Sequence, residues 1–220
     1  MSKAPVWKAP IRKAPIRKAV VLALSLAASG AALAQTADLP PGVFVAGKDA
    51  GEATAGTYAL DPFHTSVLAR VSHLGYSYSV LRFDTAEGRL GWDPAAPDKS
   101  TLSITIKTAS ITSNVKGFAE TLAGEPFLKS ATFPDATFVS TSFIRSDALR
   151  GKVAGRFTLM GRTRPVTFDV ELIGAGKGFG GSPRLGVHAR AWIDPQDYGF
   201  PPIFSDPIEI VADTEFARAP

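Results

Sequence analysis

The sequence predicts an all-β domain, an antiparallel barrel of about eight strands, and three features lead to this prediction. Apolar and polar residues alternate with a period of two in many short runs, as in TLSITIK at 101–107. Turn-forming Gly and Pro separate these runs, as in DPAAPDKS at 93–100 and GAGKGFGGSP at 174–183. Only one segment after the N-terminal region, 113–130, has helical spacing instead.

The first 34 residues have the three parts of a secretory signal peptide. Six basic and no acidic residues lie in the first 18 positions, an apolar run follows, and Ala32-Leu33-Ala34 forms an A-x-A cleavage site. A transmembrane anchor is disfavoured, because residues 19–34 are fewer than the roughly 20 apolar residues of a spanning helix and include two Ser and one Gly. We expect cleavage after Ala34, a location in the periplasm, and no stable membrane anchor afterwards.

Removal of this leader changes the charge balance of the chain. The whole chain has 24 Lys and Arg and 20 Asp and Glu, so the loss of six basic residues leaves 18 against 20, a net charge of −2. The remaining basic residues are scattered among acidic ones, which argues against a nucleic-acid partner. The chain has no Cys, which excludes disulfides, thiolate zinc sites and cysteine nucleophiles. The domain must therefore rely on a hydrophobic core, for which its length suffices.

Each segment after the leader has its own pattern. Residues 35–56 are rich in Gly, Ala and Pro without a sustained period, which predicts a flexible N-terminal segment before a domain at 57–217. Half-buried antiparallel strands are expected at 65–73, 101–107, 153–159, 166–172, 187–193 and 208–216. In 113–130, Phe118, Leu122 and Phe127 have mixed helical spacing, and we expect one or two short helices covering an end of the barrel.

No constellation of residues indicates catalysis. HExxH, GxSxG, Walker and GxGxxG patterns are absent, and most Asp residues stand beside turn residues, where Asp usually accepts hydrogen bonds from backbone amides. His64 and His73 are nine positions apart, roughly 30 Å along one strand. They cannot share a metal ion, whose distance to a His nitrogen is about 2 Å. We therefore expect no enzyme, no metal and no cofactor.

Several motifs resemble the YceI-like family. The stretch YALDPFHTSVLARVSHLGYS, at 58–77, is similar to the opening of that family, with a His near the start of a long strand and His-Leu-Gly at its end. The similarity continues through FLKSATFPDATF, GRFTLMGRTRPVTFDVEL and DYGF, and so extends over residues 57–217. Departures include Ala69, where the family often has an aromatic residue, and Thr121, where it has His.

The resemblance implies a lipocalin-like, eight-stranded antiparallel barrel with an apolar interior. Related proteins are bacterial, mostly periplasmic, and are held to bind polyisoprenoid or quinone-type lipids inside the barrel. A closed barrel of this size can hold one small ligand without exposing sheet edges. The resemblance thus implies an apolar small molecule or lipid as the partner.

The alternating pattern suggests which side chains line such a cavity, although the same residues could also fill a solid core. The predicted ligand-binding residues are Val67, Ala69, Val71, Phe83, Leu102, Ile104, Ile106, Phe157, Leu159 and Phe168. The candidates for a polar rim that meets a headgroup are Arg70, Arg82, His188, Arg190 and Trp192.

Two classes of function remain open from the sequence. The first is a periplasmic binding or carrier protein that sequesters an isoprenoid- or quinone-type lipid. The second is a non-enzymatic interaction module with a solid core, active in a stress response or beside electron-transfer partners. A homodimer is compatible with either.

Overall fold

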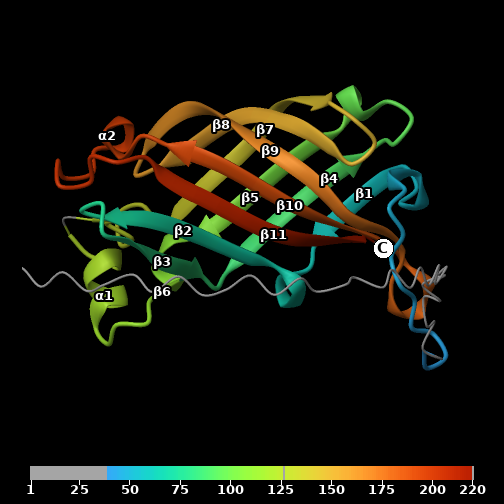
Figure 1. Cartoon of the computed structure of the whole chain (residues 1–220), viewed down its shortest axis with the longest axis horizontal. Coiled ribbons are helices and arrows are strands. Elements are labelled where there is room, and N and C mark those ends of the chain that lie inside the picture. Colours follow the sequence, from blue (N-terminus) through green and yellow to red (C-terminus); the bar gives the residue numbers. More distant parts are fainter. Residues whose placement is uncertain (1–38, 126, 220) are drawn as a thin grey trace, which may run out of the picture. The chain divides into compact units, whose positions relative to one another are not determined.

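The computed structural model describes residues 39–125 and 127–219, and the predicted leader at 1–34 lies outside them. One antiparallel sheet of eleven strands closes on itself, because β1 pairs with both β4 and β11 (Figure 1). The strands are β1 (Gly56–Leu60), β2 (Ser66–His73), β3 (Ser77–Phe83), β4 (Ala86–Trp92), β5 (Thr101–Lys107), β6 (Ile111–Thr112), β7 (Asp135–Arg145), β8 (Arg150–Leu159), β9 (Arg162–Lys177), β10 (Pro183–Ile193) and β11 (Ile208–Arg218).

These eleven strands form a barrel of eight, as predicted. Strands β1 and β2 lie one after the other along β11, and β4 and β3 lie in the same way along β1 and β2. Strands β5 and β6 pair with β4 and β3 respectively. The pairs β1 and β2, β3 and β4, and β5 and β6 therefore each act as one bent strand of the ring. The ring continues through β7, β8, β9, β10 and β11.

Tight turns set the register of two hairpins. Leu74, Gly75 and Tyr76 join β2 to β3, and Met160 and Gly161 join β8 to β9; Leu74, Gly75, Met160 and Gly161 have positive φ. Turns with two successive residues of positive φ match the twist of antiparallel strands, and they favour Gly at the second position. The His-Leu-Gly motif is therefore a hairpin turn, and His73 is the exposed last residue of β2.

Both short α-helices lie at one end of the barrel, and the turn between β7 and β8 lies at the other (Figure 1). The helix α1 (Phe118–Ala123) confirms the helical segment expected within 113–130. The helix α2 (Pro195–Tyr198) was not predicted. It is a single turn, in which the Asp194 side chain accepts a hydrogen bond from the backbone of Gln196. A helix of four residues is too short to show a period.

The N-terminal segment expected at 35–56 is in contact with the barrel in its described part. Gly47 and Ala175 exchange two backbone hydrogen bonds, of 2.9 and 3.0 Å. The Lys48 ammonium donates to the carbonyl of Ile173 at 2.6 Å, and Ala53 is fully buried. Backbone atoms, one long side chain and a single buried Ala make these contacts, and apolar periodicity reveals none of them.

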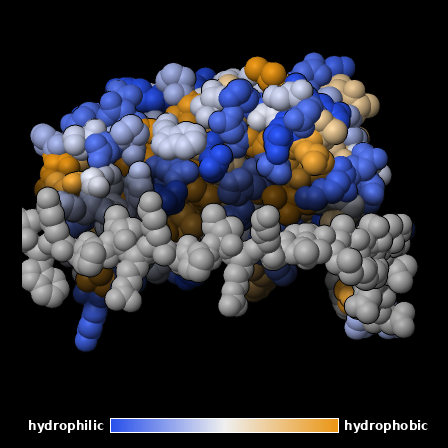
Figure 2. Space-filling view, in the orientation of Figure 1, coloured by the Kyte–Doolittle hydropathy of each residue, from blue (hydrophilic) through white to orange (hydrophobic). Residues whose placement is uncertain are grey.

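The strands separate an apolar interior from a polar exterior. The buried core includes Leu90, Val153, Leu185 and Phe216, which come from different strands of the ring. On the face shown in Figure 2, hydrophilic side chains predominate and hydrophobic ones form separate patches. Among the described residues, none of the helices is long and apolar enough to cross a membrane.

Candidate functional site

An apolar cavity of about 300 Å³ runs through the interior of the barrel. Strands on every side of the ring contribute to it, because the inward-facing residue of each strand recurs at every second position. The interior is therefore hollow, which distinguishes it from the solid core that the second sequence hypothesis required.

All ten residues predicted to bind a ligand border this cavity. They are Val67, Ala69, Val71, Phe83, Leu102, Ile104, Ile106, Phe157, Leu159 and Phe168. The alternating pattern was sufficient to place them, because the side-chain period of a strand does not depend on which strands are neighbours. That they contact a ligand stays a prediction.

The structure adds wall residues that the sequence analysis did not select. Val187 and Ala189 of β10 and Ile210 and Ala212 of β11 also border the cavity. Their alternation was visible in the sequence, and choosing the inward set on those strands would have found them. Three further aromatic residues, Phe127, Phe200 and Phe204, come from segments between elements, where no period exists.

These three phenylalanines close the cavity at the end that carries α1 and α2. The ring centroids of Phe127 and Phe204 are 5.6 Å apart, and those of Phe200 and Phe204 are 5.7 Å apart, both in edge-on contact. Such contacts between aromatic rings are favourable beyond the area that they bury. Leu122 of α1 packs into the same end.

The opposite end of the cavity contains charged side chains. Arg145, Asp147, Arg150 and Lys152, at the turn between β7 and β8, all border it. They were not predicted, because a turn between two strands gives no indication of whether it lies over the mouth of the barrel. The cavity is therefore apolar along its walls and charged at one end.

The five residues expected at a polar rim do not border this cavity. They lie elsewhere because each occupies the outward position of its strand, between two inward apolar residues. Arg70 forms an ion pair with Glu209, Arg82 with Asp84 at 2.5 Å, and His188 with Asp213 at 2.7 Å. The remaining two are neighbours: the Arg190 guanidinium lies 5.8 Å from the centre of the Trp192 ring. Their contact with a headgroup stays a prediction without geometric support.

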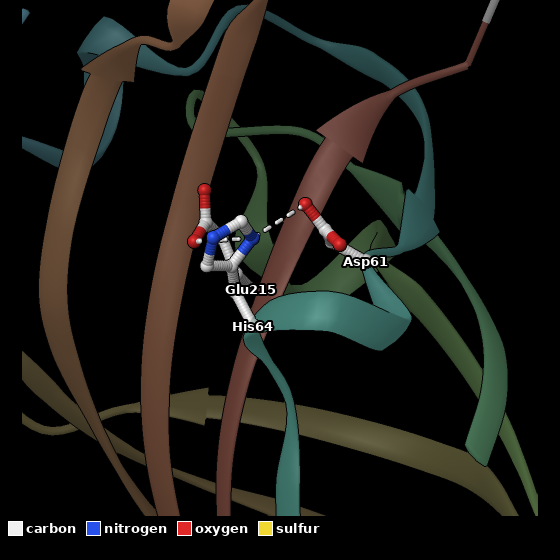
Figure 3. A group of neighbouring side chains, drawn as sticks. All are labelled: Asp61, His64 and Glu215. Atoms are coloured by element: carbon white, nitrogen blue, oxygen red, sulfur yellow. Dashed lines mark hydrogen bonds and ion pairs between the residues drawn. The ribbon is translucent and has the colours of Figure 1, made fainter. Parts of the chain in front are cut away.

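A separate charged cluster lies outside the cavity and contains the other histidine of the sequence motif. His64 belongs to a 3-10 turn, Pro62–His64, before β2 rather than to the strand itself. Its Nδ1 atom is 3.0 Å from Asp61 Oδ2 and 3.9 Å from Glu215 Oε2 (Figure 3). The Arg184 guanidinium lies between the two carboxylates, 2.6 Å from Asp61 and 2.5 Å from Glu215.

The contacts of this cluster shift its protonation. Burial raises the pKa of Asp61, but hydrogen bonds with His64, Arg184 and the backbone of Phe63 outweigh burial and bring this pKa to about 2. The hydrogen bond with Asp61 raises the pKa of His64. Asp61, His64 and Glu215 are close enough together to hold a metal ion, but the Arg184 cation already forms ion pairs with both carboxylates. The cluster is therefore an ion-pair network that joins the Asp61 turn to β10 and β11.

Comparison with known proteins gives consistent matches. The sequence pattern of the YceI-like domain matches residues 58–216. A UPF0312 protein of Pseudomonas putida is 38% identical over 152 residues, which cover 68% of this chain and 79% of that protein. The Campylobacter jejuni YCEI protein, known from a crystal structure, is 26% identical with a TM-score of 0.62, covering 68% of this chain and 91% of that one. A polyisoprenoid binding domain from Saccharophagus degradans shares the fold at 14% identity, with a TM-score of 0.54 over 74% of this chain and 98% of that one.

The matched region begins in β1 and ends in β11, so it includes the whole ring of strands that encloses the cavity. The fold, the extent of this match and the identity to the Pseudomonas putida protein agree with the motifs in the sequence. The chain belongs to the YceI-like family.

Proposed function

We propose that this protein is a periplasmic carrier that holds one isoprenoid- or quinone-type lipid chain inside its barrel. The observation that carries the proposal is the hollow apolar interior, bordered by residues from all around the ring. Apolar surface in water costs about 25 cal/mol per Å², so transfer of a lipid tail into such a cavity is strongly favourable. The Saccharophagus degradans domain is a polyisoprenoid binding domain, and we extend its ligand class to this chain as part of the proposal.

The dimensions of the cavity favour a single narrow chain. Its volume of about 300 Å³ lies at the lower end of the range for small-molecule sites. Along β7 the wall extends from Ala136 to Arg145. Nine steps of about 3.3 Å, on a strand tilted by about 40°, correspond to roughly 23 Å along the barrel axis. A long and narrow space of this kind suits one extended tail and not a phospholipid with two.

In this proposal the protein binds its lipid and does not catalyse a reaction. The histidines support this assignment, since His73 ends a hairpin strand and His64 takes part in an ion-pair network. Export and cleavage after Ala34 are likewise part of the proposal, to be tested by cell fractionation and N-terminal sequencing of the mature protein. The possible homodimer is tested by analytical ultracentrifugation.

Co-purification tests the carrier function directly. The full chain is expressed in a Gram-negative host, isolated without detergent from the periplasmic fraction, and extracted with organic solvent for mass spectrometry. We expect a stoichiometric apolar molecule with an isoprenoid tail. An extract without lipid, combined with no binding of the neutral probe N-phenylnaphthylamine, would refute the proposal.

Chain length provides a quantitative version of the same test. Each buried methylene contributes about 0.8 kcal/mol, so affinity for a series of straight-chain alcohols rises about fourfold per methylene. The rise stops when the chain fills the roughly 23 Å of wall estimated from β7. An affinity that does not depend on chain length would show that the alcohols bind outside the cavity.

A further inference from the structure

The two ends of the cavity differ in chemistry, and this difference gives the cavity a direction. The end beside α1 and α2 is closed by Phe127, Phe200 and Phe204. The end at the β7–β8 turn carries four charged residues, three cations and one carboxylate. An amphipathic ligand therefore has its lowest free energy with its tail towards the phenylalanines and its polar head at the β7–β8 turn.

Arg145 is the cation most directly placed at the mouth. In the register of β7 and β8, Phe143 pairs with Val153 and Arg145 pairs with Gly151. Phe143 and Val153 both border the cavity, so Arg145 stands two residues further along the same inward-facing set. Its partner Gly151 has no side chain, so the paired residue places no side chain opposite Arg145.

Arg145 donates its hydrogen bonds to backbone carbonyls, and its charge also helps to lower the pKa of the nearby Asp147 carboxyl. Its Nε donates to the carbonyl of Asp147 at 2.9 Å and its Nη2 to the carbonyl of Ala148 at 3.5 Å. Within residues 39–125 and 127–219, no carboxylate oxygen forms an ion pair with it. Backbone carbonyls are neutral acceptors, so they orient the guanidinium while its positive charge remains available to an anion.

One of the four charged residues at this end of the cavity is a carboxylate. The single carboxylate, on Asp147, accepts hydrogen bonds from the backbone of Leu149 and Arg150, both at 2.8 Å, and these bonds lower its pKa. The Asp147 carboxylate thus stabilises the conformation of the β7–β8 turn. Arg150 lies 3.5 Å from Glu171 and Lys152 is paired with Asp169, so these two cations contribute less than Arg145.

We infer that the β7–β8 turn is a headgroup subsite in which Arg145, supported by Arg150 and Lys152, binds the anionic head of a single-chain amphiphile. The ligand class is a carboxylate or a phosphate monoester on a long apolar tail. This inference rests on the proposed function, since it names the head of the ligand whose tail occupies the cavity. An Arg guanidinium is suited to both anions, because its fork of N–H donors matches their paired oxygen atoms.

Matched pairs of ligands separate the head from the tail. Dodecanoate is compared with dodecanol, and farnesyl phosphate with farnesol, by displacement of N-phenylnaphthylamine. In the wild-type protein each anion is expected to bind about tenfold more tightly than its neutral partner, and this advantage shrinks at high salt because the mouth is exposed to solvent. The pair with the larger advantage identifies whether a carboxylate or a phosphate is the better head.

Three variants assign the preference to the mouth. Arg145→Gln is expected to weaken binding of the anions about fivefold to tenfold and to leave the alcohols unchanged, whereas Arg145→Lys keeps most of the preference. Arg156→Gln removes an exposed cation further along β8 that does not border the cavity, and it serves as the matched control.

Equal affinity for anions and alcohols in the wild type would overturn the inference, as would equal effects of Arg145→Gln and Arg156→Gln. Failure of all four ligands to bind would overturn the proposed carrier function instead. The two proposals can therefore fail separately.

Discussion

Substitution of Ala69 by Phe tests whether the interior of the barrel is functionally hollow. Ala69 lies on β2 between Ile210 of β11 and Leu81 of β3, and its methyl group borders the cavity. A phenyl ring at this position would enter the space assigned to the ligand tail. Ala191 provides the matched control: it pairs with the other side of Ile210, is 1% exposed, and does not border the cavity.

The two variants are expected to change stability in opposite ways. In a hollow, the ring of Ala69→Phe gains up to about 2 kcal/mol from burial and causes no overpacking. At Ala191 the same ring enters a filled region, and overpacking costs about 1–3 kcal/mol. For a domain of this size, each kcal/mol shifts Tm by about 2–4 °C. Tm should therefore stay unchanged or rise for Ala69→Phe and fall by about 2–12 °C for Ala191→Phe.

Of the two substitutions, only Ala69→Phe is expected to weaken ligand binding. If the ring displaces about four methylene groups of a bound tail, at about 0.8 kcal/mol each, affinity falls roughly 200-fold. Calorimetry gives Tm, and displacement of N-phenylnaphthylamine by farnesol gives affinity. A loss of stability in Ala69→Phe as large as that in Ala191→Phe would show that the interior is filled, and the reasoning from the cavity would be refuted.

Three further substitutions test the stability of the barrel, each by chemical denaturation. Tyr198→Phe should leave stability equal or raise it by about 1 kcal/mol, because the buried hydroxyl has no hydrogen-bond partner among the described residues. Burial raises the pKa of Tyr198 from its ordinary value of 10.0 to about 12, so the wild type should lose stability as the pH rises from 10.0 to about 12, and the variant should not. Identical dependence of stability on pH in the two proteins would contradict this. Asp61→Asn should lower the free energy of unfolding by about 1–2 kcal/mol at neutral pH, after allowance for solvent screening. The pKa of Asp61 in the folded protein is about 2, below its ordinary value of 3.8, so the stabilisation by the carboxylate is lost as the pH falls from 3.8 to about 2. The difference in stability between the wild type and the variant should therefore vanish near pH 2. Gly155→Ala should cost about 1–3 kcal/mol, since a Cβ there would lie 2.4 Å from the Phe138 ring, and an unchanged unfolding midpoint would contradict this packing.

Much of the cavity wall could be predicted from the sequence. Val67, Ala69 and Val71 alternate with Leu68 and outward polar residues because the pleat of a strand directs successive side chains to opposite faces. This rule is local, so it holds whichever strands become neighbours.

The polar end could not be predicted in the same way. Arg70 and His188 were selected as rim residues because they are polar and lie on predicted strands. A strand position fixes the face on which a side chain lies, but it does not fix the distance of that side chain from the mouth of the barrel. Arg145 lies at the mouth because β7 ends there and its turn folds over the opening, and that depends on the register between β7 and β8.

The closed end also depends on contacts between distant segments. Phe127 precedes β7, whereas Phe204 precedes β11, and their rings meet at 5.6 Å. Neither segment has a regular period, so no local pattern indicates that the two are in contact.

The all-β class, the inward and outward faces of the strands, and the family all follow from the order of the residues. The hollow interior, its closure at one end by Phe127, Phe200 and Phe204, and the place of Arg145 at the other end depend on how the strands come together. The physical reason is the range of the interactions: strand periodicity arises between adjacent residues, whereas the volume and polarity of a cavity arise from side chains brought together when the ring of strands closes.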